Sequence, residues 1–453
     1  MSPKLLKGLF LATTLLGSSL IASQAAADNL EDVVRQALTT NPKMSVFLSN
    51  RESIDFELRR ERGLYLPQID IAAGIGYQQY DSQSSQLRGT DDDWLDREEY
   101  SVALTQRLFD GFEAASKIGK QKARVESASR RVFENAEVLA LDAINAFLEV
   151  RRQRELVRLS EENLQAHEDM LVNLREREAS DAGSSADVVQ TEARRSLARA
   201  TLFRVQNQLR DSEANYKRII GEHPTDLDEP TVDVSALPQD WEDALTLAKE
   251  SNPTTKIFEA EINIAKKDVE IADSNMYPKI NLEAEYSKLQ DADGDEEEID
   301  SAMLMVRMRW NLYRGGSDQA EKRAALARVM QAKNSRYDAA NGAVEEMRIS
   351  WNSYEITAER VTVLGEAVEF NQETLNNYKE LFNVGQRSLL DVLDAENELF
   401  VSRSLLVTAN SNHMSASYRM LAAGGQLLDT LNIEPPKQGN PETPTFTQQV
   451  FSD

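Results

Sequence analysis

Four segments of the chain alternate apolar and polar residues with the two-residue period of a β-strand. In the segment 302–312, Leu304 and Val306 fall on one face, whereas Arg307 and Arg309 fall on the other. The other three segments are 69–77, 100–104 and 280–286. Strands of this kind are typical of the wall of an outer-membrane barrel, but a half-buried sheet in a soluble protein shows the same alternation. The pattern alone leaves both interpretations open.

Long helical patterns follow the second and fourth of these segments. After Gly111 and Gly315 the apolar residues recur every seven positions, which predicts helices coiled on neighbouring helices. Helices of about 70 residues would reach about 105 Å, and each is expected to turn and return through a second helix of about 35 residues. The two series are Ala136, Ala143, Val150, Val157, Leu164 and Leu171, and Ala340, Met347, Tyr354, Val361, Val368, Leu375 and Phe382.

The same order of elements occurs twice along the chain. Asn41-Pro42 recurs as Asn252-Pro253, 211 residues later, and no proline occurs from 68 to 223 or from 279 to 434. Because proline breaks helices and central strands, these two windows permit long uninterrupted elements. The chain is therefore interpreted as a tandem duplication. We expect a signal peptide at 1–27, a first strand–helix repeat at 28–220, a linker at 221–240, a second repeat at 241–425 and a C-terminal tail at 426–453.

The N-terminus and the charge of the chain indicate export. Lys4 and Lys7 precede an apolar run from Leu5 to Leu20, and Ala25-Ala26-Ala27 resembles a signal-peptidase cleavage site. Removing two lysines with this segment would change the net charge from −25 to −27, which disfavours nucleic-acid binding. The chain has no cysteine, and its remainder has no run of 18 apolar residues that could form a transmembrane helix. A soluble periplasmic protein is the alternative at this point.

Four strands cannot close a membrane barrel, because such barrels need about eight or more strands and no free edge in lipid. The chain would therefore have to pool its strands with copies of itself, and cyclic symmetry is the natural arrangement. Three protomers would supply twelve strands.

The segment from Phe382 to Glu396, which reads FNVGQRSLLDVLDAE, resembles the tip motif of the TolC family of outer-membrane efflux proteins. The duplicated layout and the Asn-Pro helix starts resemble that family too. The resemblance implies an α+β membrane protein: a homotrimer with a twelve-stranded β-barrel in outer-membrane lipid, continued by a long α-helical coiled-coil periplasmic tunnel. An equatorial belt would include residues 221–245 and the C-terminal tail. A periplasmic membrane-fusion adaptor and an inner-membrane ABC exporter, or a proton-driven pump, would dock at the tips, formed by Val384, Gly385, Gln386, Gly183 and Ser184.

No constellation of residues predicts catalysis, a metal site or a cofactor. His167, His223 and His413 are scattered without ligand spacing, and surface or helix-packing positions are expected for them. The acidic segments 81–98 and 287–300 are predicted to be solvated loops. The second of them contains Asp291 to Glu298, but its glycine falls too early for an EF-hand.

Two carboxylates near the second-repeat tip, Asp391 and Asp394, lie one helical turn apart. Threefold symmetry would place six acids around the narrow end of the tunnel and attract cations. The alternative is an exposed acidic patch that favours the helix dipole. The resemblance also makes Arg387 and Asp187 candidates for polar links that hold the tip closed. The first-repeat tip lacks the Val-Gly-x-Arg pattern, so the sequence leaves open how symmetric the gate and the adaptor contacts are.

The family resemblance suggests the outer-membrane channel of a tripartite export system. Type I secretion of large adhesin-like or toxin-like proteins fits the polar tip of the first repeat. Multidrug efflux is the second candidate. A periplasmic coiled-coil scaffold without a pore would explain the heptads, but not four alternating strands with aromatic residues near their ends.

Overall fold

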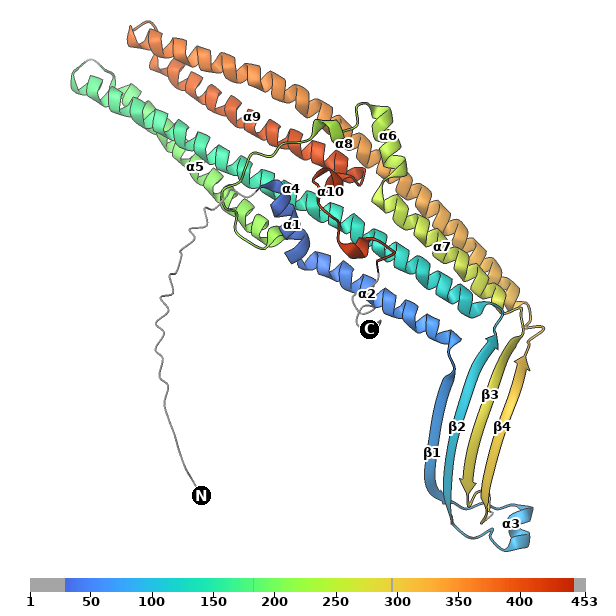
Figure 1. Ribbon diagram of the computed structural model, residues 1–453. Helices are drawn as coiled ribbons and strands as arrows, with labels where there is room; N and C mark the ends of the chain where they lie inside the picture. Colours follow the sequence, from blue (N-terminus) through green and yellow to red (C-terminus); the bar gives the residue numbers. More distant parts are fainter. Residues whose placement is uncertain (1–28, 182, 295, 444–453) are drawn as a thin grey trace, which may run out of the picture.

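The computed structural model describes residues 29–181, 183–294 and 296–443, so the expected signal peptide lies outside the described part. The molecule is elongated: a four-stranded sheet occupies one end, and long helices extend from it to two helical tips at the other end (Figure 1). The elements, in chain order, are α1 Leu30–Thr40, α2 Pro42–Arg62, η1 Gly63–Tyr65, β1 Gln68–Gln78, α3 Gln83–Arg88, β2 Leu95–Phe109, α4 Glu113–Ala179, α5 Ser185–Ile220, η2 Val234–Ala236, α6 Trp241–Glu250, α7 Pro253–Ser274, β3 Lys279–Gln290, β4 Glu298–Arg309, α8 Ser317–Asn383, α9 Leu389–Ala423, α10 Leu427–Thr430 and η3 Lys437–Gly439.

The four predicted strands form one antiparallel sheet in the order β1-β2-β3-β4. The two repeats meet at its centre, where β2 pairs with β3 and Val102 lies opposite Tyr286. Pairing begins immediately after Pro67 and Pro278, as the proline positions predict. Within the described chain, β1 and β4 each pair along one side only, so both outer edges of the sheet carry unpaired backbone groups.

The predicted loop boundaries at the far end of the sheet were wrong. Strand β2 begins at Leu95, inside the predicted 81–98 loop, and α3 occupies part of the remainder. Strands β3 and β4 extend to Gln290 and from Glu298, which shortens the predicted 287–300 loop, and β4 ends before Trp310. Charged residues in these strands resemble loop residues in the sequence, but neighbouring strands bring opposite charges together, as in the Lys288–Glu298 ion pair.

A glycine turn joins each repeat's second strand to its long helix. Gly111 and Gly315 have φ angles of 70° and 63°, in the left-handed region that glycine adopts without a side-chain clash. In the first repeat, the Asp110 carboxylate accepts a hydrogen bond of 2.8 Å from the backbone N–H of Ala114 at the start of α4. The switch from strand to helix therefore occurs where the sequence period changes.

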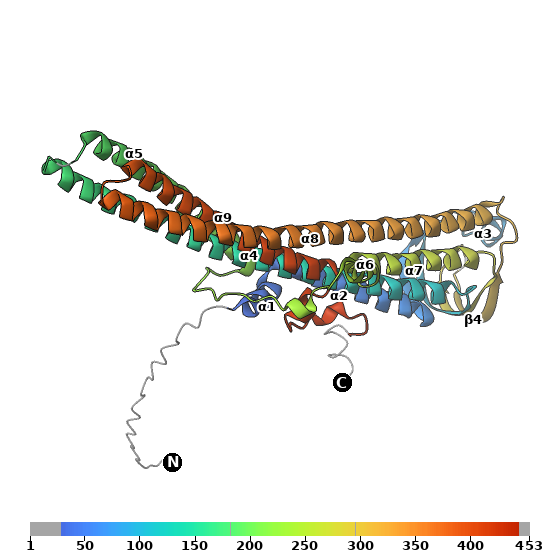
Figure 2. The same cartoon turned by 90° about the horizontal axis from the view of Figure 1, so that it is seen from above.

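The long helices confirm the heptad prediction. Helices α4 and α8 contain 67 residues each, and they return through α5 with 36 residues and α9 with 35. Two parallel helical hairpins result, α4/α5 and α8/α9, with their turns at the same end of the molecule (Figures 1 and 2). Heptad residues from both repeats are buried between the helices, among them Ala136, Ala143, Val150, Leu171, Met347 and Leu375.

A collar of short segments packs against the middle of the long helices. We use "collar" for α1, the linker 221–240, α6 and residues 424–443, which include α10 (Figure 2). Its apolar side chains belong to the main hydrophobic core together with residues of α4 and α9; Val34, Ala244 and Leu427 are completely buried. The hydroxyl of Tyr418 donates to the linker carbonyl of Thr231 at 3.3 Å. These contacts hold the linker and the C-terminal residues to the long helices.

Candidate functional site

The tip of the second repeat is a tight, exposed turn. Helix α8 ends at Asn383, and Gly385 has a φ of 75°, which places it in the left-handed region. The backbone N–H of Gln386 donates to the Leu381 carbonyl at 2.8 Å, which closes the last helical turn. The Val384 side chain is 68% exposed beside this turn. The turn therefore presents an apolar residue and backbone groups at the very end of the molecule.

Ser388 and Asp391 form a reciprocal cap at the start of α9. The Ser388 hydroxyl accepts from the Asp391 backbone N–H at 3.3 Å, and the Asp391 carboxylate accepts from the Ser388 N–H at 3.2 Å. The Ser388 hydroxyl and backbone hydrogen bonds hold the pKa of Asp391 below its ordinary value, and Arg387 lowers it further. Asp391 is therefore ionised at neutral pH, and its first role is structural.

Arg387 is held within its own tip. Its guanidinium Nη1 lies 3.5 Å from a carboxylate oxygen of Asp391, and the guanidinium carbon lies 4.4 Å from the centre of the Tyr378 ring. Both interactions fix the arginine beside the turn, since a guanidinium over an aromatic face is attracted to it. In the described part of the protomer, no hydrogen bond or ion pair joins Arg387 to Asp187.

Asp394 has a partner from the other repeat. Arg194 on α5 donates from Nη2 to Oδ1 of Asp394 on α9 at 2.7 Å, although the two residues are 200 positions apart. The side chains are 31% and 49% exposed, so the pair is open to solvent. This contact links the two helical hairpins near their tips. Arg194 was not predicted from the sequence, because nothing in its local pattern distinguishes it from the neighbouring arginines.

The first-repeat tip has a different construction. Ser184 caps α5 by accepting a hydrogen bond of 3.2 Å from the Ala186 N–H. A side chain at Gly183 would come within 2.9 Å of the backbone nitrogen of Glu178, so the turn is tightly folded back. The carboxylate of Asp187 lies in the first turn of α5 and has no ion pair with the described residues. The two tips therefore differ in structure as well as in sequence.

Apolar contacts hold the two hairpins together behind the tips. One cluster joins α4 and α5 to the start of α9, and a second lies between α8 and α9. Their buried members are Leu171, Leu174, Val188, Leu389 and Leu393 in the first, and Leu375, Val392, Ala395 and Leu399 in the second. The polar residues of the tip are thus carried on a packed base.

Two of the three histidines lie in helix packing, as expected. His167 is 4% exposed on α4, and burial lowers its pKa, so the ring is neutral at physiological pH. His413 stacks on Tyr354 with ring centres 4.8 Å apart, and His223 lies 3.0 Å from Lys217. No group of three or more metal-ligating side chains occurs within the described ranges.

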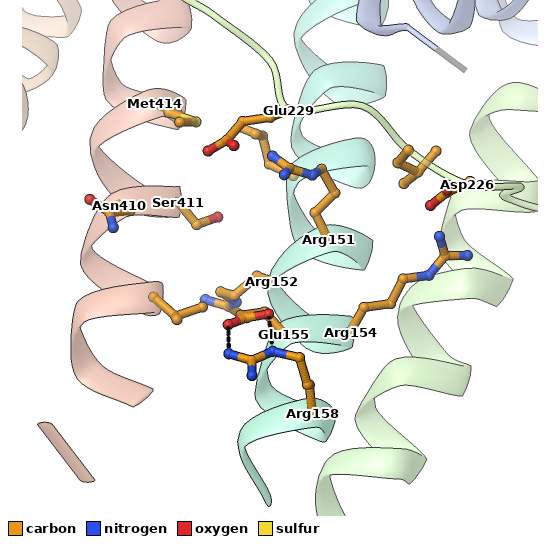
Figure 3. Close-up of a pocket in the computed structure, with 13 residues that line it drawn as sticks. Arg151, Arg152, Arg154, Glu155, Arg158, Asp226, Glu229, Asn410, Ser411 and Met414 are labelled. Atoms are coloured by element: carbon orange, nitrogen blue, oxygen red, sulfur yellow. Dashed lines mark hydrogen bonds and ion pairs between the residues drawn. The ribbon is translucent and has the colours of Figure 1, made fainter. Parts of the chain in front are cut away.

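A cleft of about 570 Å³ lies between α4, the linker and α9 (Figure 3). Arginines of α4 line this cleft, and two of them bind neighbouring groups of the protein. Arg154 donates to the linker carbonyls of Thr225 and Pro224 at 2.5 and 3.2 Å, and Arg158 pairs with Glu155 at 2.5 Å. Arg154 therefore fastens the linker to the long helix, whereas Arg158 pairs within α4. This contact with the linker was not predicted, although the closely spaced arginines from 151 to 158 are visible in the sequence.

The fold and the tip define an elongated channel subunit of paired helical hairpins attached to a β-sheet. Residues 33–222 and 244–426 match the family described as outer membrane efflux protein. The chain belongs to this family, which confirms its resemblance to the TolC family. It is an outer membrane efflux channel protein, and the members of its family are channels rather than enzymes. None of the described helices is long and apolar enough to cross a membrane.

Similar proteins span nearly the whole chain. The outer membrane efflux protein BepC of Brucella suis is 26% identical, covering 95% of this chain and 93% of its own length. TolC of Escherichia coli is 22% identical (94% and 90%), and the alkaline protease secretion protein AprF of Pseudomonas aeruginosa is also 22% identical (92% and 88%). The crystal structure of VceC from Vibrio cholerae superposes with a TM-score of 0.74 at 17% identity, covering 87% and 96% of the two chains.

Proposed function

We propose that three copies of this chain form one outer-membrane channel with a periplasmic tunnel, the exit duct of a tripartite export system. The observation that carries this proposal is the sheet: its outer strands have open edges, and apolar side chains cover one face. Ile71 and Ile75 on β1 are 77% and 80% exposed, and Leu304 on β4 is 72% exposed. Open edges and an exposed apolar face are unstable in water, but they suit a barrel wall completed by neighbouring copies in lipid.

The helical part supports the same assembly. Helix α8 carries an exposed apolar stripe with a strict seven-residue spacing: Ile349, Ile356, Val363 and Phe370. This stripe is separate from the buried heptad series that faces α9. A second apolar seam on one helix indicates a second coiled-coil neighbour. Helix α5, at the other side of the protomer, exposes Val189, Leu197 and Phe203, which would supply the complementary surface in the next copy.

The tip residues are proposed to form the periplasmic gate and the docking site. Asp391, Asp394, Arg387 and Asp187 would surround the narrow end of the tunnel. The exposed turns with Val384, Gly385 and Gln386, and with Gly183 and Ser184, would contact a periplasmic membrane-fusion adaptor. An inner-membrane ABC exporter, or alternatively a proton-driven pump, would supply the energy, because the chain has no nucleotide-binding motif.

Type I protein secretion is the proposed transport process. The polar first-repeat tip, with Ser184, Ser185 and Asp187 in its first turns, differs from the second and suits a wide, hydrophilic passage. The name of AprF, a protease secretion protein, supports this proposal, whereas the name of BepC, an outer membrane efflux protein, supports efflux, and multidrug efflux is the second candidate. A deletion strain distinguishes them: loss of a large protein from the culture medium supports secretion, and increased drug sensitivity alone supports efflux.

The channel itself is tested with the full-length protein extracted from the outer-membrane fraction. Native mass spectrometry is expected to give the mass of three chains, and planar bilayers are expected to show discrete conductance steps. A periplasmic scaffold would instead appear in the soluble fraction and would produce no conductance steps in the bilayer.

A further inference from the structure

Two carboxylates of the second-repeat tip are paired with arginines within one protomer. Arg194 binds Asp394 across the two hairpins at 2.7 Å, and Arg387 lies 3.5 Å from Asp391 within the second. Two carboxylates therefore face two guanidinium groups, and these four side chains sum to no net charge. A ring of six bare acids, expected from the sequence, would require these carboxylates to lack partners.

Arg194 is the cation that compensates Asp394, because the neighbouring cations have other partners. Lys379 binds Glu396 at 3.0 Å, and the His167 ring is neutral because burial lowers its pKa. On the acidic side, Glu192 of α5 is bound by Arg175 at 2.6 Å. Among the described residues, the closest ion-pair partner of Arg194 is Asp394.

The exposure of this pair decides what it does. An ion pair as open to solvent as Arg194–Asp394 contributes little to stability, and packed apolar clusters already join the hairpins. The ion pair matters more to a permeating ion than to stability. Removing the guanidinium would leave one uncompensated negative charge per protomer, and therefore three around a threefold axis.

We infer that Arg194 sets the ion selectivity of the tunnel entrance by neutralising Asp394. This inference rests on the proposed trimeric channel. The first repeat thereby supplies the positive charge, on Arg194, that balances Asp394 of the second repeat. The sequence difference between the two repeats near their tips would then serve ion selectivity. At the Arg194–Asp394 pairs the entrance is charge-compensated, so this ring has a weak preference for cations and a low affinity for polyvalent ones.

The test measures trivalent-cation block and reversal potential of the full-length channel in planar bilayers. Hexaamminecobalt(III) is the probe, added from the tip side. Arg194→Ala is expected to raise the affinity of the channel for the blocking ion by about tenfold or more. It should also shift the reversal potential toward the equilibrium potential of the permeating cation, with little change in the conductance measured without the blocker. Arg194→Gln, which keeps more of the packing, should give the same result if the alanine variant assembles poorly.

Two further variants isolate the pair. Asp394→Asn combined with Arg194→Ala restores the balance of charge and should return the block to the wild-type value. Arg204→Ala removes an exposed arginine from the same helix about 15 Å away, beyond the Debye length of about 10 Å, and should leave both readouts unchanged.

The outcomes separate the two proposals. If Arg194→Ala and Arg194→Gln form pores with the same block and the same reversal potential as wild type, the role of Arg194 is overturned, while the proposed channel stands. Absence of wild-type conductance would overturn the channel and, with it, the inference.

Discussion

Asn41 and Asn252 make the same two contacts at equivalent positions of the two repeats. Each side-chain oxygen caps the helix that follows, α2 or α7. Each side-chain amide donates to the end of a distant helix: to the Ile219 carbonyl of α5 at 2.8 Å, and to the Ala423 carbonyl of α9 at 3.0 Å. Both side chains are buried. The Asn-Pro dipeptide thus fastens the beginning of one helix to the end of another.

Asn252→Ala is expected to destabilise the protein by about 2–3 kcal/mol, because it removes a helix cap and leaves a buried carbonyl without its donor. Asn252→Ser keeps a capping oxygen and loses the amide donor without adding a charge, so its effect should be smaller. Thermal denaturation in detergent would rank the variants. Asn207→Ala, at an exposed site on α5, serves as the control. Equal midpoints for Asn252→Ala and this control would refute the fastening role.

Glu137 makes stability depend on pH. It is 2% exposed on α4, and its oxygens accept hydrogen bonds from the backbone N–H groups of Leu427 and Leu428 at 3.1 and 3.2 Å. Burial raises the pKa of this carboxyl from 4.5 to about 7, and the charge of Asp429 adds to the rise, although the two hydrogen bonds oppose it. Between these values the folded protein binds a proton that the unfolded chain releases.

The stability contributed by protonated Glu137 is therefore present in full below pH 4.5 and is lost as the pH rises to about 7, by about 3 kcal/mol in total. Glu137→Gln should flatten this part of the profile. Melting temperatures measured from pH 4.5 to 8 would show it, with Glu161→Gln on the exposed side of α4 as the matched control. The assignment fails if Glu137→Gln follows the wild-type slope.

Arg387→Ala and Asp187→Ala are each expected to raise single-channel conductance. The first removes the contacts to Asp391 and Tyr378 that hold the tip turn, and the second removes a carboxylate with no ion pair inside the described protomer. Planar-bilayer recordings provide the measurement, and Arg210→Ala on the exposed side of α5 provides the control. Conductance equal to wild type in both variants would exclude them from the gate.

The double variant Asp391→Ala with Asp394→Ala should weaken block by polyvalent cations. It leaves Arg387 and Arg194 without their carboxylates, so the entrance becomes positively charged and repels such ions. Titration of hexaamminecobalt(III) against single-channel current measures the effect. A block curve that coincides with the wild-type curve would show that neither acid lines the ion path.

Gly111→Ala is expected to impair assembly more than Gly315→Ala. Both glycines have a positive φ, so both variants suffer similar backbone strain. A Cβ at Gly111 would also lie 2.7 Å from the Ser274 carbonyl oxygen and from Cβ of Tyr277, whereas nothing lies within 4 Å of a Cβ at Gly315. The yield of heat-resistant trimer in the outer-membrane fraction compares the two, and equal yields would contradict the close approach.

Periodicity made most of the fold predictable from the sequence. The heptad residues Val150 and Met347 are buried as expected, and the strands begin directly after Pro67 and Pro278. A burial pattern repeated over many turns identifies a helix even when its individual residues are ambiguous. The loop boundaries failed because strand charges such as Lys288 and Glu298 compensate each other only when their strands are paired.

The candidate site was predictable only in part. The resemblance of the second tip identified Arg387, Asp391 and Asp394, and the structure places them within a few turns of one another at the end of α8 and the start of α9. Arg194 could not be found in this way. Its significance comes from a contact with a residue 200 positions away, and one sequence carries no information on which of several exposed arginines makes that contact.

Helices α4 and α8 have the same length, 67 residues, although their sequences have diverged widely. Both start at a strand exit and end at a tip, so an insertion in one of them alone would push its hairpin past the other and separate Arg194 from Asp394. Lengthening during evolution must therefore occur in both repeats together, and in steps of seven residues that keep the apolar seams aligned. Selection can therefore change the length of the tunnel in the periplasm only in discrete increments that occur in both repeats together.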